Sequence, residues 1–234
     1  ASLSVYGFKQ KNIILTSAPI ALMIFIKGYG IYPLAAMLLM KRYREFFTTI
    51  VISVILFAST IPLFGISAYT EYYDKFYSLV AFSGITSHVS YQTLNSLFGH
   101  MFSYDAQFNP NAISLMPQKL IYFILQAAGF SLLLYMAYGV NKVKDFPERV
   151  QMMLFVSAFA LNVLFAPGAE DHHSVLYLPL LYFIISNYLK DLRFDLRYIL
   201  LLIAVLLLAL PLPFRQLGDA GFPLYLFAYP RVYG

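Results

Sequence analysis

The chain of 234 residues contains no cysteine and no tryptophan, and only 12% of its residues are charged. Without cysteine it can form no disulfide, no thiolate metal site and no cysteine nucleophile. An ordinary soluble domain has about 25% charged residues, so the shortage of charge argues against that class. Hydrophobic residues make up 60% of the chain and the mean hydropathy is +0.70. These values predict an integral membrane protein that is all-α and folds as a polytopic bundle of transmembrane helices.

Several familiar motifs are also missing. The sequence contains no phosphate-binding glycine loop, no nucleophile elbow and no redox-cofactor motif, so we expect no cofactor. The adjacent residues His172 and His173 lack the spacing that puts two ligands on one helical face, so we expect no metal. The net charge of +5 comes from basic turns between apolar segments, so no nucleic-acid partner is expected. No cleavable signal peptide is evident at the N-terminus.

Apolar runs predict the membrane segments. Residues 12–26 and 31–40 are shorter than the about 20 residues that a full span needs, so they predict a hairpin of short, broken helices with Lys27 at its tip. Longer runs predict single helices at residues 46–64, 120–140, 151–165, 174–189 and 198–210. One membrane domain accounts for residues 1–234. Within it, residues 65–117 are the largest predicted loop.

The distribution of lysine and arginine predicts the orientation. Cytoplasmic connections collect these residues, and most of the 16 in this chain lie at residues 9–11, 41–44, 142–149 and 190–197. The opposite, extracytoplasmic face then receives residues 65–117 and 166–173. All four histidines fall on that side.

Residues 166–173 gather ionisable side chains between two apolar segments. These side chains are Glu170, Asp171, His172 and His173. Pro167 and Gly168 end the preceding helix, because proline lacks the amide proton. Partial desolvation at the bilayer edge can move a pKa towards neutrality, as a general base requires. The segment is therefore a candidate proton-transfer site, and the alternative is a helix N-cap at the lipid interface.

Two further candidates concern substrate binding. Residues 86–102 predict an amphipathic helix that lies along the outer surface. Its polar face would present Gln92, Thr93, Asn95, Ser96 and His100. Such groups can hydrogen-bond a sugar, although they also make an ordinary wet surface. Lys27, at the break in the hairpin, could neutralise a lipid phosphate, and the alternative is that its side chain extends to the headgroups.

Three short motifs follow one another along the chain. The first runs from Ile26-Lys27 through Tyr32-Pro33-Leu34 to Lys41-Arg42, the second from Tyr91-Gln-Thr-Leu-Asn-Ser-Leu to Phe102, and the third from Ala166 to His173 and on to Leu178-Pro179. Their order and spacing resemble the polyprenyl-phosphate-dependent membrane glycosyltransferases of the GT-C type. The resemblance is to glycosyltransferase family 87 in particular, which is mannosyltransferase-like.

The motifs depart from the family pattern in several places. The family has Lys-x-x-Pro, whereas Lys27 and Pro33 are farther apart here. In the Asn-Gln-Ser-Leu motif, this chain has Tyr91 for Asn, Thr93 for Ser and, further on, His100 for an Arg. In the Ser-Pro-x-x-Trp-x-His segment, Glu170 replaces Trp and His172 falls on the histidine.

The resemblance implies transfer of a sugar, mannose as the first expectation, from a polyprenyl-phosphate donor to an extracytoplasmic lipid or glycan acceptor at a prokaryotic plasma membrane. His172 would be catalytic or contact phosphate, with Asp171 or Glu170 as its polar partner. Other expected contacts, listed by role, are Gln92, Thr93 and Asn95 to the substrate and Lys27 or His100 near the phosphate.

The resemblance also implies that this chain corresponds to the C-terminal portion of a longer protein. Family members place a catalytic aspartate in a first outer loop, to which no segment here corresponds. The front part of the protein, or a second polypeptide, would then supply this aspartate. The rival hypothesis is a non-catalytic membrane subunit or a transporter half, because transporters also contain broken helices. A transporter would place charged groups near the midplane on several spans, and here only Lys27 fits that description.

Overall fold

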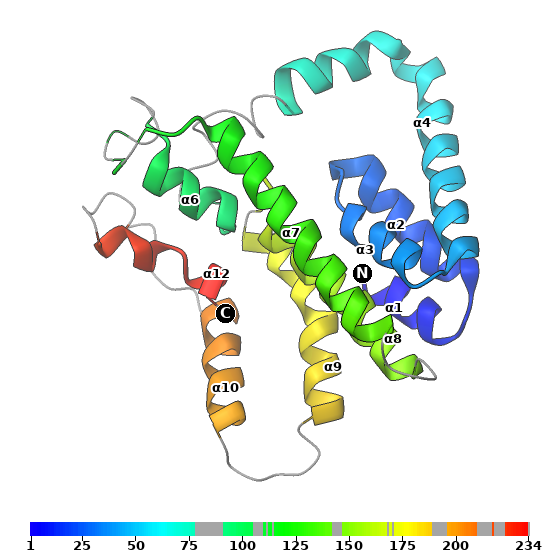
Figure 1. Cartoon of the computed structure of the whole chain (residues 1–234). Helices are drawn as coiled ribbons and strands as arrows, with labels where there is room; N and C mark the ends of the chain where they lie inside the picture. The colour runs from blue at the N-terminus through cyan, green and yellow to red at the C-terminus, as the bar shows by residue number, and fades with distance from the viewer. Residues whose placement is uncertain are drawn as a thin grey trace. The chain divides into compact units, whose positions relative to one another are not determined.

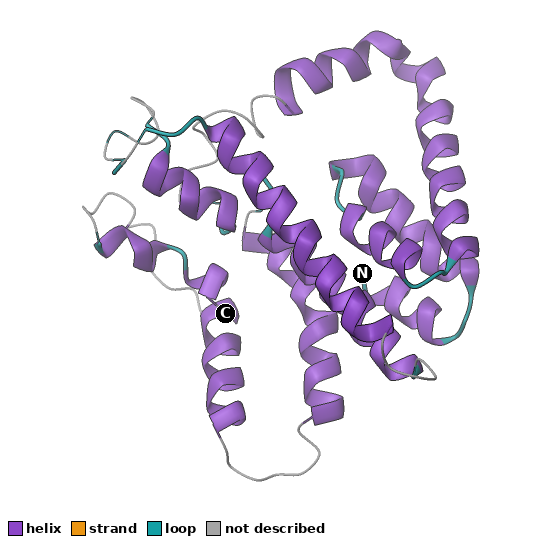
Figure 2. Cartoon of the chain, in the orientation of Figure 1, coloured by secondary structure: helices purple, strands orange, loops and turns teal. Residues whose placement is uncertain are grey.

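A computed structural model describes residues 1–77, 91–104, 110, 112–113, 115–141, 147–167, 169, 171–188, 196–209, 217 and 223–233. In these residues every regular element is a helix, and no strand is present (Figures 1 and 2). The first elements are α1 (Ser2–Lys9), α2 (Ile13–Lys27), α3 (Ile31–Leu39), α4 (Tyr43–Glu71), the π-helix η1 (Tyr72–Tyr77) and α6 (Leu94–Phe102). The later ones are α7 (Gln118–Asn141), α8 (Glu148–Leu164), the 3₁₀ helix η3 (Asp171–Tyr177), α9 (Leu178–Tyr188), α10 (Leu196–Ala209), the 3₁₀ helix η4 (Leu224–Ala228) and α12 (Pro230–Tyr233). The predicted all-α class is confirmed.

Two helices are long and apolar enough to cross a membrane. They lie at Tyr43–Lys75 and Gln118–Gly139, and both contain segments predicted as spans. Three shorter apolar helices lie at Ile13–Ile26, Val175–Asn187 and Tyr198–Leu208. The helix predictions at residues 120–140, 151–165 and 198–210 agree with α7, α8 and α10 to within a few residues.

The chain divides into two compact units that interleave along the sequence. Unit 1 comprises Ala1–Tyr72, Ala127–Val163 and Leu176–Ile184. Unit 2 comprises Tyr73–Gln126, Leu164–Val175 and Ile185–Gly234.

In unit 1, α2 and α3 form the predicted hairpin of short helices. Asn12 begins α2 by accepting a hydrogen bond from the Leu15 amide at 3.0 Å, as a helix N-cap does. Gly28 ends α2 in the left-handed conformation with φ 68°, and Gly30 precedes α3 with φ 113°. The Gly30 N–H donates to Asn162 Oδ1 of α8 at 3.0 Å, and both groups are buried. This bond fixes the turn of the hairpin against α8.

Helix α4 carries a sharp bend. Its backbone leaves helical geometry at Gly65 (φ 74°, ψ 160°), and the α4 ribbon visibly changes direction along its length (Figure 1). The predicted span ended one residue earlier, because a glycine followed by less apolar residues is a typical helix stop. In the structure helical turns resume after the bend and continue through η1. Whether residues 65–117 form an extracytoplasmic loop stays a prediction.

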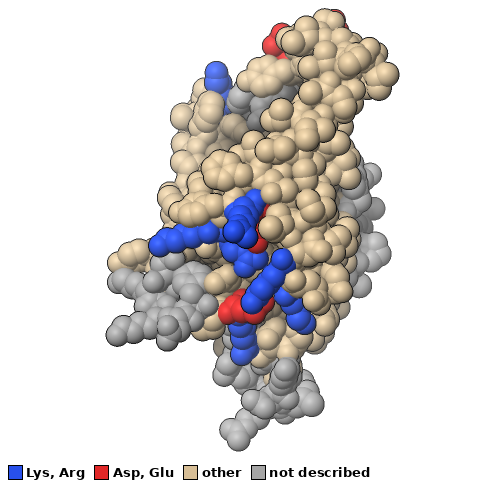
Figure 3. Space-filling view, turned by 90° about the vertical axis from the view of Figure 1, so that its right-hand side faces the viewer, with Lys and Arg blue, Asp and Glu red and all other residues tan. Residues whose placement is uncertain are grey.

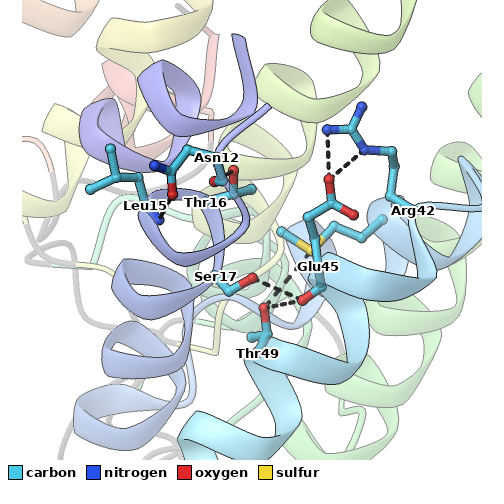
Figure 4. Close-up of polar contacts among 8 residues, drawn as sticks. Asn12, Leu15, Thr16, Ser17, Arg42, Glu45 and Thr49 are labelled. Carbon is cyan, nitrogen blue, oxygen red and sulfur yellow. Dashed lines mark hydrogen bonds and ion pairs between the residues drawn. The ribbon is translucent and has the colours of Figure 1, made fainter. Parts of the chain in front are cut away.

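Polar contacts around Glu45 stabilise the start of α4 and connect it to the preceding helices of unit 1 (Figure 4). Glu45 is buried and forms an ion pair with Arg42 at 2.6 Å. The Glu45 carbonyl oxygen accepts hydrogen bonds from Ser17 Oγ at 3.0 Å and Thr49 Oγ1 at 2.8 Å. The Arg42 guanidinium lies 4.5 Å from the centre of the Phe8 ring. Residues from α1, α2 and the start of α4 are thereby held together.

Basic side chains gather beside this network. Lys9, Lys11, Lys41 and Arg44 are exposed at the α1–α2 and α3–α4 turns. The space-filling view shows lysine and arginine concentrated in one area of a face that is otherwise almost uncharged (Figure 3). The concentration is the feature from which the sequence predicts a cytoplasmic surface.

Replacing Gly30 by alanine should destabilise the protein more than replacing Gly28. Both positions have positive φ, which costs a non-glycine residue about 1–2 kcal/mol. A Cβ at Gly30 would also lie 2.9 Å from Ile24 Cγ1 and 3.2 Å from the Ile20 carbonyl oxygen, whereas a Cβ at Gly28 meets nothing within 4 Å. Overpacking of this kind adds about 1–3 kcal/mol. Thermal unfolding of both variants in detergent measures the difference, and equal midpoints would contradict the assigned packing.

Candidate functional site

Unit 2 contains a cluster of buried polar side chains around the start of α6. The cluster includes all of the predicted substrate-binding residues of this region: its members are Gln92, Thr93, Asn95, Ser96, His100 and Gln118. Burying amides and hydroxyls is unfavourable unless they are hydrogen-bonded. The hydrogen-bond partners of these side chains therefore show which parts of the fold they hold together.

Thr93 begins α6. Its backbone is extended (φ −131°, ψ 162°), and its Oγ1 accepts a hydrogen bond from the Ser96 amide at 3.1 Å. The two hydroxyls also lie 2.9 Å apart. A threonine in this position satisfies one of the amides that a helix leaves unpaired at its start. This contact sets where the second motif becomes helical.

The backbone after α8 supplies the acceptors for the second motif. Alternate carbonyl oxygens of this segment accept from three amide donors: Phe165 O from Gln126 Nε2, Pro167 O from Asn95 Nδ2 at 2.9 Å, and Ala169 O from the Gln92 N–H at 2.9 Å. Pro167 cannot continue a helix, so the carbonyl groups here need partners from elsewhere. The second and third motifs, which are 72 positions apart at Asn95 and Pro167, therefore meet in unit 2.

Helices α6 and α7 approach closely at Gly99. A Cβ at this position would lie 2.6 Å from Gln118 Oε1. Gln118 is buried, and its Nε2 lies 3.5 Å from the Asn95 carbonyl oxygen. A larger residue at position 99 would displace the Gln118 amide from the cluster.

The surface helix predicted over residues 86–102 is corrected in two respects. Its helical part is α6, Leu94–Phe102, and residues 86–90 lie outside the described residues. The polar side chains Asn95 and His100 are buried, whereas Phe98 is 37% exposed, so the prediction of a wet polar face is wrong. The reason is that this polar face finds hydrogen-bond partners inside unit 2, which satisfies the condition for burying it.

The predicted catalytic residues are described only in part. Glu170 lies outside the described residues, as does His88. Asp171 and His172 belong to the backbone of η3, but their side chains lie outside the described part, and so does the Lys27 side chain at the end of α2. His173 is buried. The catalytic roles of Glu170, Asp171 and His172 stay predictions.

The sequence did not predict the contribution of the C-terminal segment. Gln92 Nε2 donates to the Ala228 carbonyl oxygen at 3.0 Å, and His100 Nδ1 lies 2.8 Å from the Tyr229 hydroxyl. Tyr229 is completely buried. The chain contains 20 tyrosines, and no local pattern distinguishes this one, because its partner is 129 positions away.

Metal binding finds no support in the part of the chain that the structure describes. There, no group of three or more His, Cys, Asp or Glu residues is arranged to hold an ion. The polar groups of the cluster itself are amides, hydroxyls and one imidazole. Chemically, such a set can hydrogen-bond hydroxyls and anionic oxygens.

Comparison with known proteins gives one match. A family model described as glycosyltransferase family 87 matches residues 2–167. No curated protein and no solved structure matches the chain significantly. The family match confirms the resemblance predicted from the three motifs. It includes the first two motifs and reaches Pro167 in the third.

Asn95→Asp should destabilise the protein strongly. The substitution replaces a buried donor by a carboxylate that faces the Pro167 carbonyl oxygen, and an uncompensated buried charge costs about 3–5 kcal/mol. Asn187→Asp is the matched control, because Asn187 is only partly buried and its Nδ2 contacts the neighbouring Ser186 hydroxyl. Thermal unfolding in detergent tests both. Similar losses in the two variants would exclude a special role for the Asn95 contact.

Proposed function

Since the chain belongs to glycosyltransferase family 87, we propose that it transfers a sugar from a polyprenyl-phosphate donor to a lipid or glycan acceptor. Mannose is the first candidate for the sugar, and the proposed site is the extracytoplasmic face of a prokaryotic plasma membrane. The observation that carries this proposal is the family match over residues 2–167. It supports glycosyltransferase activity in general, with a sugar donor, an acceptor and a membrane context.

The proposed reaction joins an acceptor oxygen to the anomeric carbon of the sugar. The acceptor hydroxyl attacks that carbon, its proton passes to a base, and the polyprenyl phosphate leaves with the electron pair of the broken bond. A base and a cationic or hydrogen-bonding environment for the phosphate are the two requirements. We assign the role of base to His172, with Asp171 or Glu170 as its polar partner. The alternative base is an aspartate supplied by an upstream segment or a second polypeptide.

The cationic or hydrogen-bonding environment for the donor phosphate is assigned to residues of the first two motifs. We propose that Lys27 or His100 lies near the donor phosphate and that Gln92, Thr93 and Asn95 contact the substrate. Buried hydrogen bonds hold the last three in fixed orientations. Fixed donors and acceptors favour catalysis because they need no reorganisation when charge develops.

The test of the function is transfer of radiolabelled mannose from polyprenyl-phosphate-mannose to endogenous acceptors, in membranes that carry the full-length protein. His172→Ala at matched expression should lower incorporation by about a hundredfold or more, because loss of a general base removes a factor of about 10²–10⁴. His173→Gln is the control at the neighbouring histidine. Because His173 is buried, the thermal midpoint of this variant should be measured as well, so that a loss of stability is distinguished from a loss of activity.

The outcomes separate the hypotheses. If His172→Ala and wild type transfer mannose equally, the enzyme stands but residues 166–173 have no part in its chemistry. If no incorporation depends on the protein, the same assay with other polyprenyl-phosphate sugars follows. Failure with all of them would replace the proposal by the non-catalytic membrane subunit or transporter half.

A second prediction concerns the phosphate. Lys27→Gln should raise the apparent KM for the donor by about ten- to a hundredfold, since a hydrogen bond to a charged group contributes about 1.5–3 kcal/mol. Lys27→Arg should retain most of the affinity because it keeps the charge. The control is Lys9→Gln, which removes a lysine exposed at the end of α1. Equal donor KM values in the two glutamine variants would remove Lys27 from the phosphate site.

A further inference from the structure

We propose that the C-terminal segment around Tyr229, residues 228–231, is part of the site, and that Tyr229 is a positioning residue that holds the imidazole ring of His100. The segment lies beyond residues 2–167, which the family match covers. The inference rests on the proposed function, because it assigns His100 a place near the donor phosphate.

Gln92 fixes the segment on both sides of Tyr229. Its Nε2 donates to the Ala228 carbonyl oxygen at 3.0 Å. Its Oε1 accepts from the backbone N–H of Arg231 at 3.4 Å. One side chain of the second motif therefore contacts the backbone immediately before Tyr229 and two residues after it. This arrangement leaves the tyrosine little freedom to shift along α6.

The Tyr229 hydroxyl then contacts two groups of α6. It lies 2.8 Å from His100 Nδ1 and donates to the Ser96 carbonyl oxygen at 3.4 Å. A phenol has one proton, and a carbonyl oxygen can only accept. The contact to Nδ1 is the shorter of the two, and its donor depends on the tautomer of the His100 ring. The contact thus fixes the plane of the His100 ring, which determines how the ring presents itself to a substrate.

Apolar packing holds the tyrosine ring in place. Tyr229 and Ala228 are fully buried and pack with Leu97 of α6, and Met101 packs against the same group. The Tyr229 and His100 rings meet edge to face, with centroids 5.8 Å apart and an interplanar angle of 79°. Because the ring fills the core, removing it would disturb the fold. Phenylalanine removes only the hydroxyl and is the informative substitution.

The experiment compares Tyr229→Phe with Tyr233→Phe in the full-length protein. Tyr233 lies two residues beyond that segment, is 50% exposed and donates to the Leu226 carbonyl oxygen at 3.1 Å, so it is a matched control. Tyr229→Phe should raise the donor KM by about five- to tenfold, the effect of losing one hydrogen bond. Tyr233→Phe should behave as wild type.

A double-mutant cycle with His100→Gln distinguishes positioning from general stability. If Tyr229 acts through His100, adding Tyr229→Phe to His100→Gln should change the donor KM by less than about twofold, because coupled residues are not additive. If the five- to tenfold increase recurs in full in the His100→Gln background, Tyr229 does not act through His100 and the inference is overturned.

Amide hydrogen exchange gives a readout that needs no activity. Tyr229→Phe should speed exchange in α6 by several-fold relative to Tyr233→Phe, because it removes contacts to Ser96 and His100. Unchanged exchange in α6 would overturn the inference. If no donor supports turnover, the proposed function fails, and the exchange experiment alone then decides whether the C-terminal segment holds α6.

Discussion

The hydrogen bond from Asn95 Nδ2 to the Pro167 carbonyl oxygen is the contact on which unit 2 depends. Helix α8 ends at Leu164, and Pro167 follows three residues later, so the carbonyl groups of this stretch have no helical partners. Amide donors from Gln92 and Gln126 satisfy the carbonyl oxygens of Ala169 and Phe165 on either side. The third motif thus takes its backbone position from the second motif and from α7.

This arrangement changes how the amides of the second motif should be interpreted. A loss of activity on substituting Asn95 can arise from a lost substrate contact or from movement of the backbone that leads into residues 170–173. Stability and turnover therefore have to be measured together at these positions. The same holds for Gln92, whose backbone contacts Ala169 and whose side chain contacts Ala228 and Arg231.

Neutral hydrogen bonds also organise unit 1. The turn of the α2–α3 hairpin is held by Asn162, and two hydroxyls converge on the Glu45 carbonyl oxygen. Amide and hydroxyl groups cost less to bury than charges when they are paired. A chain with 12% charged residues can fix its helices in this way without placing many ions in an apolar surrounding.

The sequence by itself determined the helical class, the broken hairpin, the approximate bounds of α7, α8 and α10, and the family. These follow from hydropathy, segment length and motif order, which are local properties of the chain. Only the tertiary structure decided that the polar face of α6 points inward and that Tyr229 lies against His100. Helical periodicity identifies residues that share a face but not the direction of burial. That direction depends on partners such as Pro167 and Tyr229, which lie 72 and 129 positions away from Asn95 and His100.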